Sequence, residues 1–169
     1  MKIGTKSLLF GAHQFILHPF FVFLSWWRQF GFPFNPRIWV AIIVHDWGYW
    51  GAEDIDGLEG KVHPVVGAKI TRFLFGRDWL EFTLQHSRYF SKGRINKLCA
   101  ADKGSLCFDH WLIYIPRILL SGEVYEFIKK EDTDTYFCVI MKAYRFWKMV
   151  KSAWIENKNL IKINEDFIL

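Results

Sequence analysis

An apolar run from Val40 to Val44 ends at an adjacent imidazole and carboxylate, His45 and Asp46. Such a run predicts a buried helix, and these two groups are costly to bury unless each has a strong partner. A divalent metal ion would be such a partner, because imidazole nitrogen and carboxylate oxygen both suit Zn, Mn, Fe or Co. The alternative is a helix end where both side chains meet water before Gly48. For an isolated pair that alternative is favoured, so the interpretation depends on the rest of the chain.

Length and composition predict one folded, core-rich domain. The chain has 169 residues, of which 51% are hydrophobic and 19% aromatic, and this excludes disorder. The net charge of +5 is spread along the chain, which favours anionic ligands but gives no sign of a nucleic-acid partner. The three cysteines are an odd number without metal-type pairing, so we expect no disulfide framework and a reducing, cytoplasmic location.

The N-terminal stretch from Leu8 to Trp27 follows two lysines and could pass for a signal peptide or a membrane anchor. Polar residues and a proline interrupt it, and no small-residue cleavage site follows. We therefore expect a buried helix and no membrane association, with membrane attachment as the alternative.

The periodicity predicts helices throughout and no alternating strands, so the fold class is all-α. Prolines suited to a first helical turn and glycines suited to helix ends mark several boundaries. A Gly-rich acidic segment between Trp47 and Val62 is expected to form a loop beside the site. The expected helices cover residues 19–30, 36–46, 63–76, 79–90, 97–106, 111–120, 123–128 and 135–154.

Six ionisable residues lie on, or next to, these short helices, in apolar segments that are expected to be buried. A single core histidine is more often satisfied by a backbone carbonyl than by a metal. Here the coincidence matters, because the residue types occur in the order His, His-Asp, His, His, Asp. The six residues are His18, His45, Asp46, His63, His86 and Asp102.

This ordered set resembles the HD-domain superfamily of metal-dependent phosphohydrolases. The segment from His18 to Val22 is similar to the His-Pro-x-x-Val start of the first ligand helix in HD hydrolases of the stringent-response nucleotide. The segment from Ile43 to Gly48 resembles the apolar-His-Asp-x-Gly signature, and the segment from Ala101 to Lys103 resembles the Ala-Asp-Lys of the closing ligand helix.

His63 and His86, with the residues that follow them, resemble the extra histidines of the HD subgroup that holds two metals. The resemblance implies a compact helical HD-domain bundle over residues 1–169, with a ligand-bearing core at about 10–108 and helices at about 109–169 that complete it. It implies one or two divalent ions (Mn, Fe, Zn, Co or Mg) per chain. The first would be held by His18, His45, Asp46 and Asp102, and the second by Asp46, His63 and His86. His13 is an alternative to His18 as the first ligand.

The resemblance also implies hydrolysis of a phosphoester, in a nucleotide or a similar small phosphorylated compound, by a metal-activated water. Asp46, Lys103 and Arg88 are the residues that we expect to act in catalysis, the last two by binding phosphate. Many HD proteins carry Lys where this chain has Tyr49, which would donate a hydrogen bond or pack. Alternatives are an HD-fold di-iron oxygenase, a non-catalytic binding or regulatory protein on an HD scaffold, and a membrane-associated helical protein. A homodimer is possible on this interpretation.

Overall fold

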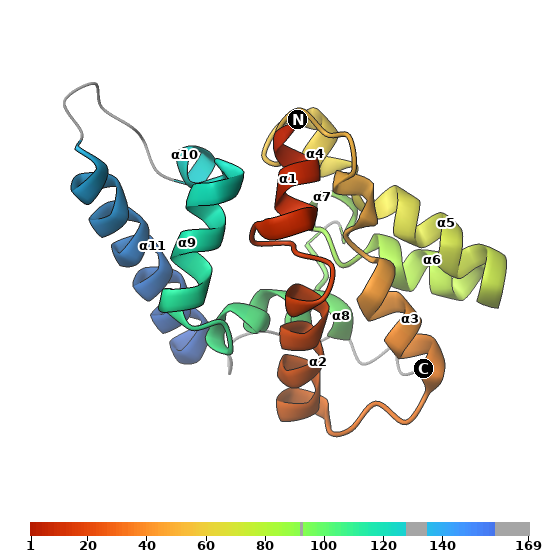
Figure 1. The fold of residues 1–169 in the computed structure, drawn as a ribbon. Helices are drawn as coiled ribbons and strands as arrows, with labels where there is room; N and C mark the ends of the chain where they lie inside the picture. Colours follow the sequence, from red (N-terminus) through yellow and green to blue (C-terminus); the bar gives the residue numbers. More distant parts are fainter. Residues whose placement is uncertain (92, 128–134, 158–169) are drawn as a thin grey trace.

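The fold is helical throughout the part of the chain described by the structure, a computed structural model (Figure 1). The described residues are 1–91, 93–127 and 135–157, and they contain no β-strand. The expected all-α class is thus confirmed for these residues. The helices are α1 (Ile3–Phe10), α2 (Leu17–Phe30), α3 (Pro36–Val44), η1 (Trp47–Tyr49), α4 (Leu58–Lys61), α5 (Pro64–Phe75), α6 (Arg77–Leu84), α7 (Arg88–Ser91), α8 (Lys97–Gly104), η2 (Ser105–Cys107), α9 (Trp111–Ser121), α10 (Val124–Phe127) and α11 (Tyr136–Asn157).

Local sequence explains where several helices begin and end. The side chain of Asn35 accepts a hydrogen bond from the Arg37 N–H at 3.0 Å, and Pro36 occupies the first position of α3. The glycines that follow α2 and α5, Gly31 and Gly76, have φ angles of 84° and 93°, which favour glycine at a helix end. The expected starts of α3 and α5 are therefore confirmed.

The expectation of a continuous helix between Leu8 and Trp27 is wrong, because the chain turns between α1 and α2. The side chain of Gln14 accepts hydrogen bonds from the N–H groups of Ile16 and Leu17 at 2.9 and 2.6 Å, which starts α2 two residues before the expected start. A β-carbon at Gly11 would overlap the buried carboxylate of Glu123, so this turn needs a glycine. None of the helices in the described ranges is long and apolar enough to cross a membrane.

The expected helix over residues 79–90 is also interrupted. Helix α6 ends at Leu84, His86 lies in a turn, and α7 is a separate short helix. The expected loop between Trp47 and Val62 contains the single turns η1 and α4. Ile128, the expected last residue of the helix that contains α10, lies outside the described residues.

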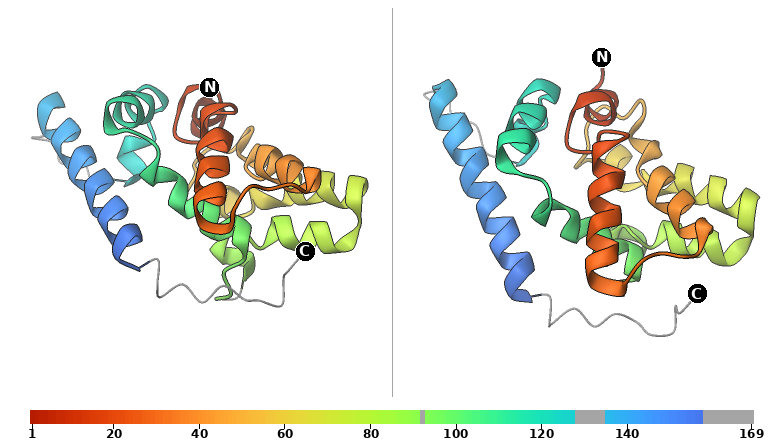
Figure 2. Two further views of the ribbon diagram at one scale, coloured as in Figure 1. Left: turned by 90° about the horizontal axis from the view of Figure 1, so that it is seen from below. Right: turned by 60° about the horizontal axis from the view of Figure 1, so that its bottom comes forward.

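Two of the three buried clusters join the longer helices. One joins α2, α3, α6 and α8 through large side chains such as Trp26 and Trp79. The other joins α9 and α11 through side chains such as Ile118 and Trp147. Figures 1 and 2 show α9 and α11 on one side of α2, and α5 and α6 on the other. The single HD-type domain over residues 1–169 stays a prediction, and residues 158–169 lie outside the described part.

Candidate metal centre

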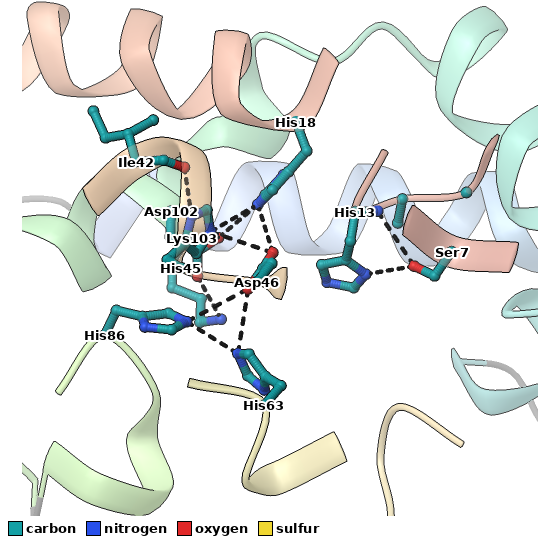
Figure 3. Close-up of polar contacts among 12 residues, drawn as sticks. Ser7, His13, His18, Ile42, His45, Asp46, His63, His86, Asp102 and Lys103 are labelled. Carbon is teal, nitrogen blue, oxygen red and sulfur yellow. Dashed lines mark hydrogen bonds and ion pairs between the residues drawn. The ribbon is translucent and has the colours of Figure 1, made fainter. Parts of the chain in front are cut away.

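The six residues singled out in the sequence converge on one point of the structure, as Figure 3 shows. His18 lies in the first turn of α2, and His45 and Asp46 follow α3 directly. His63 precedes α5, and His86 lies in the turn after α6. Asp102 lies in α8. All six side chains are buried, so these polar groups depend on one another rather than on bulk water.

The first group consists of His18, His45, Asp46 and Asp102. The Nε2 atom of His18 lies 3.1 Å from Asp46 Oδ2 and 3.2 Å from Asp102 Oδ1. The Nε2 atom of His45 lies 3.2 Å from Asp46 Oδ2 and 3.2 Å from His18 Nε2. Each residue offers one ligand atom, and these atoms all lie within 4.8 Å of one another. A single cation could therefore contact all four.

The second group consists of Asp46, His63 and His86. The Nε2 atom of His63 lies 3.2 Å from Asp46 Oδ1, and the Nε2 atom of His86 lies 3.5 Å from the same oxygen. The two Nε2 atoms are 3.0 Å apart. Asp46 thus presents Oδ2 to the first group and Oδ1 to the second. One carboxylate therefore joins two sets of nitrogen and oxygen ligands.

Backbone carbonyls fix the orientation of three of the imidazoles. The Nδ1 atoms of His45, His63 and His86 lie 2.7, 2.5 and 2.6 Å from carbonyl oxygens three residues earlier in the chain, those of Ile42, Gly60 and Thr83. A carbonyl oxygen only accepts, so each Nδ1 carries a proton and donates it. In a neutral ring the Nε2 atom then has a free lone pair. This is the second hydrogen bond by which proteins orient metal-binding histidines.

The electrostatics of the centre favour positive charge. Burial alone would raise the carboxyl pKa values, but His45 holds the pKa of Asp46, and Lys103 that of Asp102, well below the usual range. Burial lowers the pKa of His45, but Asp46 and Asp102 outweigh it and raise that pKa to about 10. At His86, in contrast, burial prevails and lowers the pKa to about 4.

These residues fit a divalent cation, and an unsatisfied atom supports the fit. Asp46 Oδ2 is buried and has no hydrogen-bond donor directed at it, although two imidazole nitrogens lie within 3.2 Å. Buried carboxylate oxygens normally accept a hydrogen bond or bind a cation, so a bound cation would explain this atom. Nitrogen and oxygen ligands without thiolate suit Mn, Fe, Zn, Co or Mg.

His13, the alternative first ligand, belongs to neither group of possible metal ligands found among the described residues. Its Nδ1 atom lies 2.8 Å from Ser7 Oγ and 3.6 Å from Glu123 Oε2, and its ring packs edge-on against His18 (Figure 3). His13 lines the cavity beside the metal ligands. The structure therefore places His18, and not His13, among the converging atoms.

The two basic residues expected to bind substrate, Lys103 and Arg88, occupy different positions. Lys103 Nζ lies 2.9 Å from Asp102 Oδ2, and this pairing raises the pKa of Lys103. Lys103 therefore holds one oxygen of Asp102 while the other faces His18. Arg88 is exposed and lines a cavity of about 870 Å³ that is open to the metal ligands. Other cavity residues that sequence reasoning did not single out include Lys61, Tyr89 and Phe146.

Tyr49 and two glycines complete the support of the centre. The ring of Tyr49 stacks on that of His63 at 4.1 Å between ring centres, with an interplanar angle of 13°. Of the two roles expected for Tyr49, a hydrogen-bond donor or a packing residue, the structure shows packing. A β-carbon at Gly48 would overlap the backbone carbonyl of His63, and one at Gly67 would overlap that of Val44. These glycines let the segment around His63 approach the end of α3. The Gly48 signal was present in the sequence, as part of the His-Asp-x-Gly pattern.

Comparisons of the chain with protein-family models, with curated proteins and with solved structures found no match.

Proposed function

We propose that this protein is a metal-dependent phosphohydrolase of the HD type. It would cleave a phosphoester bond of a small phosphorylated compound such as a nucleotide. The observation that carries the proposal is the placement of Asp46, whose two oxygens face two different sets of imidazoles. A carboxylate shared in this way suits a pair of divalent cations. The order of the six residues along the chain supports the HD assignment.

The geometry supports two ligand sets. His18, His45, Asp46 and Asp102 would hold one cation, and Asp46, His63 and His86 would hold the other. When bound, such cations lower the pKa of water and neutralise the oxygens of a phosphoester. The carbonyls of Ile42, Gly60 and Thr83 orient the Nε2 atoms of three imidazoles toward the centre. These protein contacts set the ligand geometry in advance, so little reorganisation would be needed.

The cavity supplies the groups that would bind the substrate. Its volume of about 870 Å³ suits a molecule of nucleotide size. Arg88 would bind phosphate through two parallel hydrogen bonds, and Lys61 adds a second positive charge to the same lining. Lys103 would act through Asp102, which it holds, as well as through its charge. Tyr89 and Phe146 give the lining two aromatic rings against which a flat group could stack.

We also propose that the protein works in the cytoplasm without a nucleic-acid partner. The three cysteines are free, which fits a reducing compartment. Homodimer formation stays a prediction.

Phosphate release from a panel of nucleotides and sugar phosphates in the presence of Mn tests the proposal. We expect the wild-type protein to release phosphate from at least one member, and His45→Ala to release none. His110→Ala is the matched control, because His110 is exposed at the start of α9 and does not line the cavity. Iron-dependent oxygen consumption without phosphate release would assign the centre to an oxygenase instead.

A further inference from the structure

A continuous aromatic surface covers one side of α2, α3 and the turn between them. Several of its rings are exposed to an unusual degree: Phe34 is 87% exposed, Trp27 52% and Phe20 51%. Single exposed apolar side chains are common, but a connected group of this size marks an interaction site. We call it the α2–α3 aromatic surface, and it consists of Phe20, Phe23, Trp27, Phe32, Phe34, Trp39 and Ile43.

The rings of this surface contact one another. Phe23 stacks on Trp39 at 4.5 Å, and Phe32 lies 5.6 Å from Trp27 and 5.0 Å from Phe34, measured between ring centres. The indole N–H of Trp39 donates to the Pro33 carbonyl at 2.7 Å, so it needs no outside partner. A shallow hollow of about 270 Å³ beside these rings is lined only by apolar residues.

The part of the surface at the α2–α3 turn lies far from the candidate metal centre. His18 lies at the start of α2, whereas the turn follows Phe30 at its end. At 1.5 Å per residue, these two positions are about 18 Å apart along the helix. Figures 1 and 2 show the α2–α3 turn projecting at the edge of the molecule, away from α9 and α11.

Positive charge flanks the surface. Arg28 and Arg37 are exposed at the end of α2 and the start of α3, and residues 1–45 contain no Asp or Glu. Arg37 lies over the ring of Phe75 at 5.7 Å, and Lys97 lies over the ring of Phe30 at 6.0 Å. The carboxylates of the neighbouring α6 are Asp78 and Glu81, and Glu81 is paired with Arg77 at 3.2 Å.

We propose that the α2–α3 aromatic surface binds the surface of an anionic lipid bilayer. Trp and Phe rings favour the region between headgroups and acyl chains, and Arg is attracted to anionic headgroups. A projecting turn that carries Phe34, 87% exposed, can enter that region without a concave partner. The binding is peripheral, since no described helix spans a membrane. It replaces the sequence-based expectation of no membrane association and does not depend on the proposed hydrolase function.

Flotation with phosphatidylcholine vesicles, with and without phosphatidylglycerol, tests this proposal on the full chain. We expect the wild-type protein to float with the anionic vesicles, less so at high salt, with a blue shift of tryptophan emission. The double variant Phe32→Ser/Phe34→Ser is expected to lose about tenfold or more in binding. Phe73→Ser is the matched control, because Phe73 is 88% exposed on α5 and lies outside the surface.

A second pair of variants keeps the test valid if the double serine variant does not fold. Arg28→Gln/Arg37→Gln leaves the aromatic rings in place and is expected to weaken flotation and its salt dependence. His45→Ala is expected to float like the wild type, which separates this proposal from the metal centre. The proposal is overturned if the wild type does not float, or if Phe73→Ser loses binding as strongly as the double serine variant. It is also overturned if the surface mediates only self-association, seen as a dimer that the double serine variant abolishes.

Discussion

The Nε2 atoms of His63 and His86 face each other at 3.0 Å, while the Nδ1 atom of each ring lies within hydrogen-bond distance of a carbonyl three residues earlier. When both rings are neutral, neither has a proton at Nε2 to donate to the other. Two lone pairs at this distance repel unless a positive charge lies between or beside them. This relationship, more than the presence of histidines, supports a cation at the second group.

Loss of either histidine should therefore remove one cation and leave the other. We expect His86→Ala to reduce the metal content of a fully loaded protein from about two ions to about one per chain. The first group, with Asp102 and His18, keeps all its ligands in this variant. Elemental analysis after gel filtration measures the content, with His110→Ala as the control. An unchanged content would rule out His86 as a ligand.

Metal removal should destabilise the fold. A ligand at 100 times its Kd stabilises a protein by about 2.7 kcal/mol, which corresponds to roughly 5–10 °C in Tm for a chain of this size. We expect a decrease of this order when a chelator is added, because buried carboxylates then lose their partner. Thermal unfolding with and without chelator measures it. A Tm that does not respond to the chelator would show that no cation stabilises the folded state.

Gly48→Ala should disturb the centre through packing alone. The added methyl group would overlap the carbonyl of His63, and overpacking of this kind costs about 1–3 kcal/mol. We expect lower stability and a reduced affinity of the second group for metal. Gly31→Ala is the control, because its β-carbon meets no atom within 4 Å and only its φ angle of 84° is unfavourable. Both variants should lose stability, but only Gly48→Ala should lose metal.

Arg88→Gln should weaken substrate binding and leave the metal content unchanged. Arg88 lines the cavity but belongs to neither ligand group. Loss of a charge-assisted hydrogen bond to phosphate costs about 1.5–3 kcal/mol, or roughly tenfold to more than a hundredfold in kcat/KM. Steady-state kinetics on the best substrate of the panel measure this, with the exposed Arg72→Gln on α5 as the control. Equal effects of the two variants would remove Arg88 from the site.

Glu123 should make stability depend on pH in the acidic range. It is fully buried and accepts hydrogen bonds from the Ala12 N–H at 2.9 Å and from the Ser121 hydroxyl at 2.6 Å. Burial would raise its carboxyl pKa, but His13 and these donors lower it overall. A lowered pKa contributes stability that is present above the unfolded pKa, near 4.3, and is lost as the pH falls through the folded pKa.

The comparison of wild type with Glu123→Gln isolates this contribution from the other buried carboxylates. We expect the variant to be less stable by about 1–3 kcal/mol at pH 7, and the difference to shrink below about pH 4. Urea unfolding at several pH values gives the free energies. A difference that is constant from pH 3 to pH 7 would contradict the assigned pKa shift.

Much of the helical framework could be predicted from local signals, since Asn35, Pro36 and Pro64 act within one helical turn. The convergence of His18 with His45 could be expected only through resemblance, because it depends on packing between distant segments. The interruptions at Gly11 and near His86 were missed for the same reason. Glu123, the residue that precedes α10, makes Gly11 necessary, and no local sequence pattern predicts a contact between residues so far apart in the chain. Prediction of the Nδ1 contacts to carbonyls would likewise need each helix end to be known to within one residue.

The most direct test of the shared carboxylate is the metal content of the wild type beside Asp46→Ala, each reconstituted with Mn and freed of excess ion. Asp46 faces both ligand groups, so we predict up to two ions per chain in the wild type and a loss at both groups in the variant. A wild-type protein that binds no transition metal after reconstitution, or an Asp46→Ala variant that retains the full content, would contradict the account.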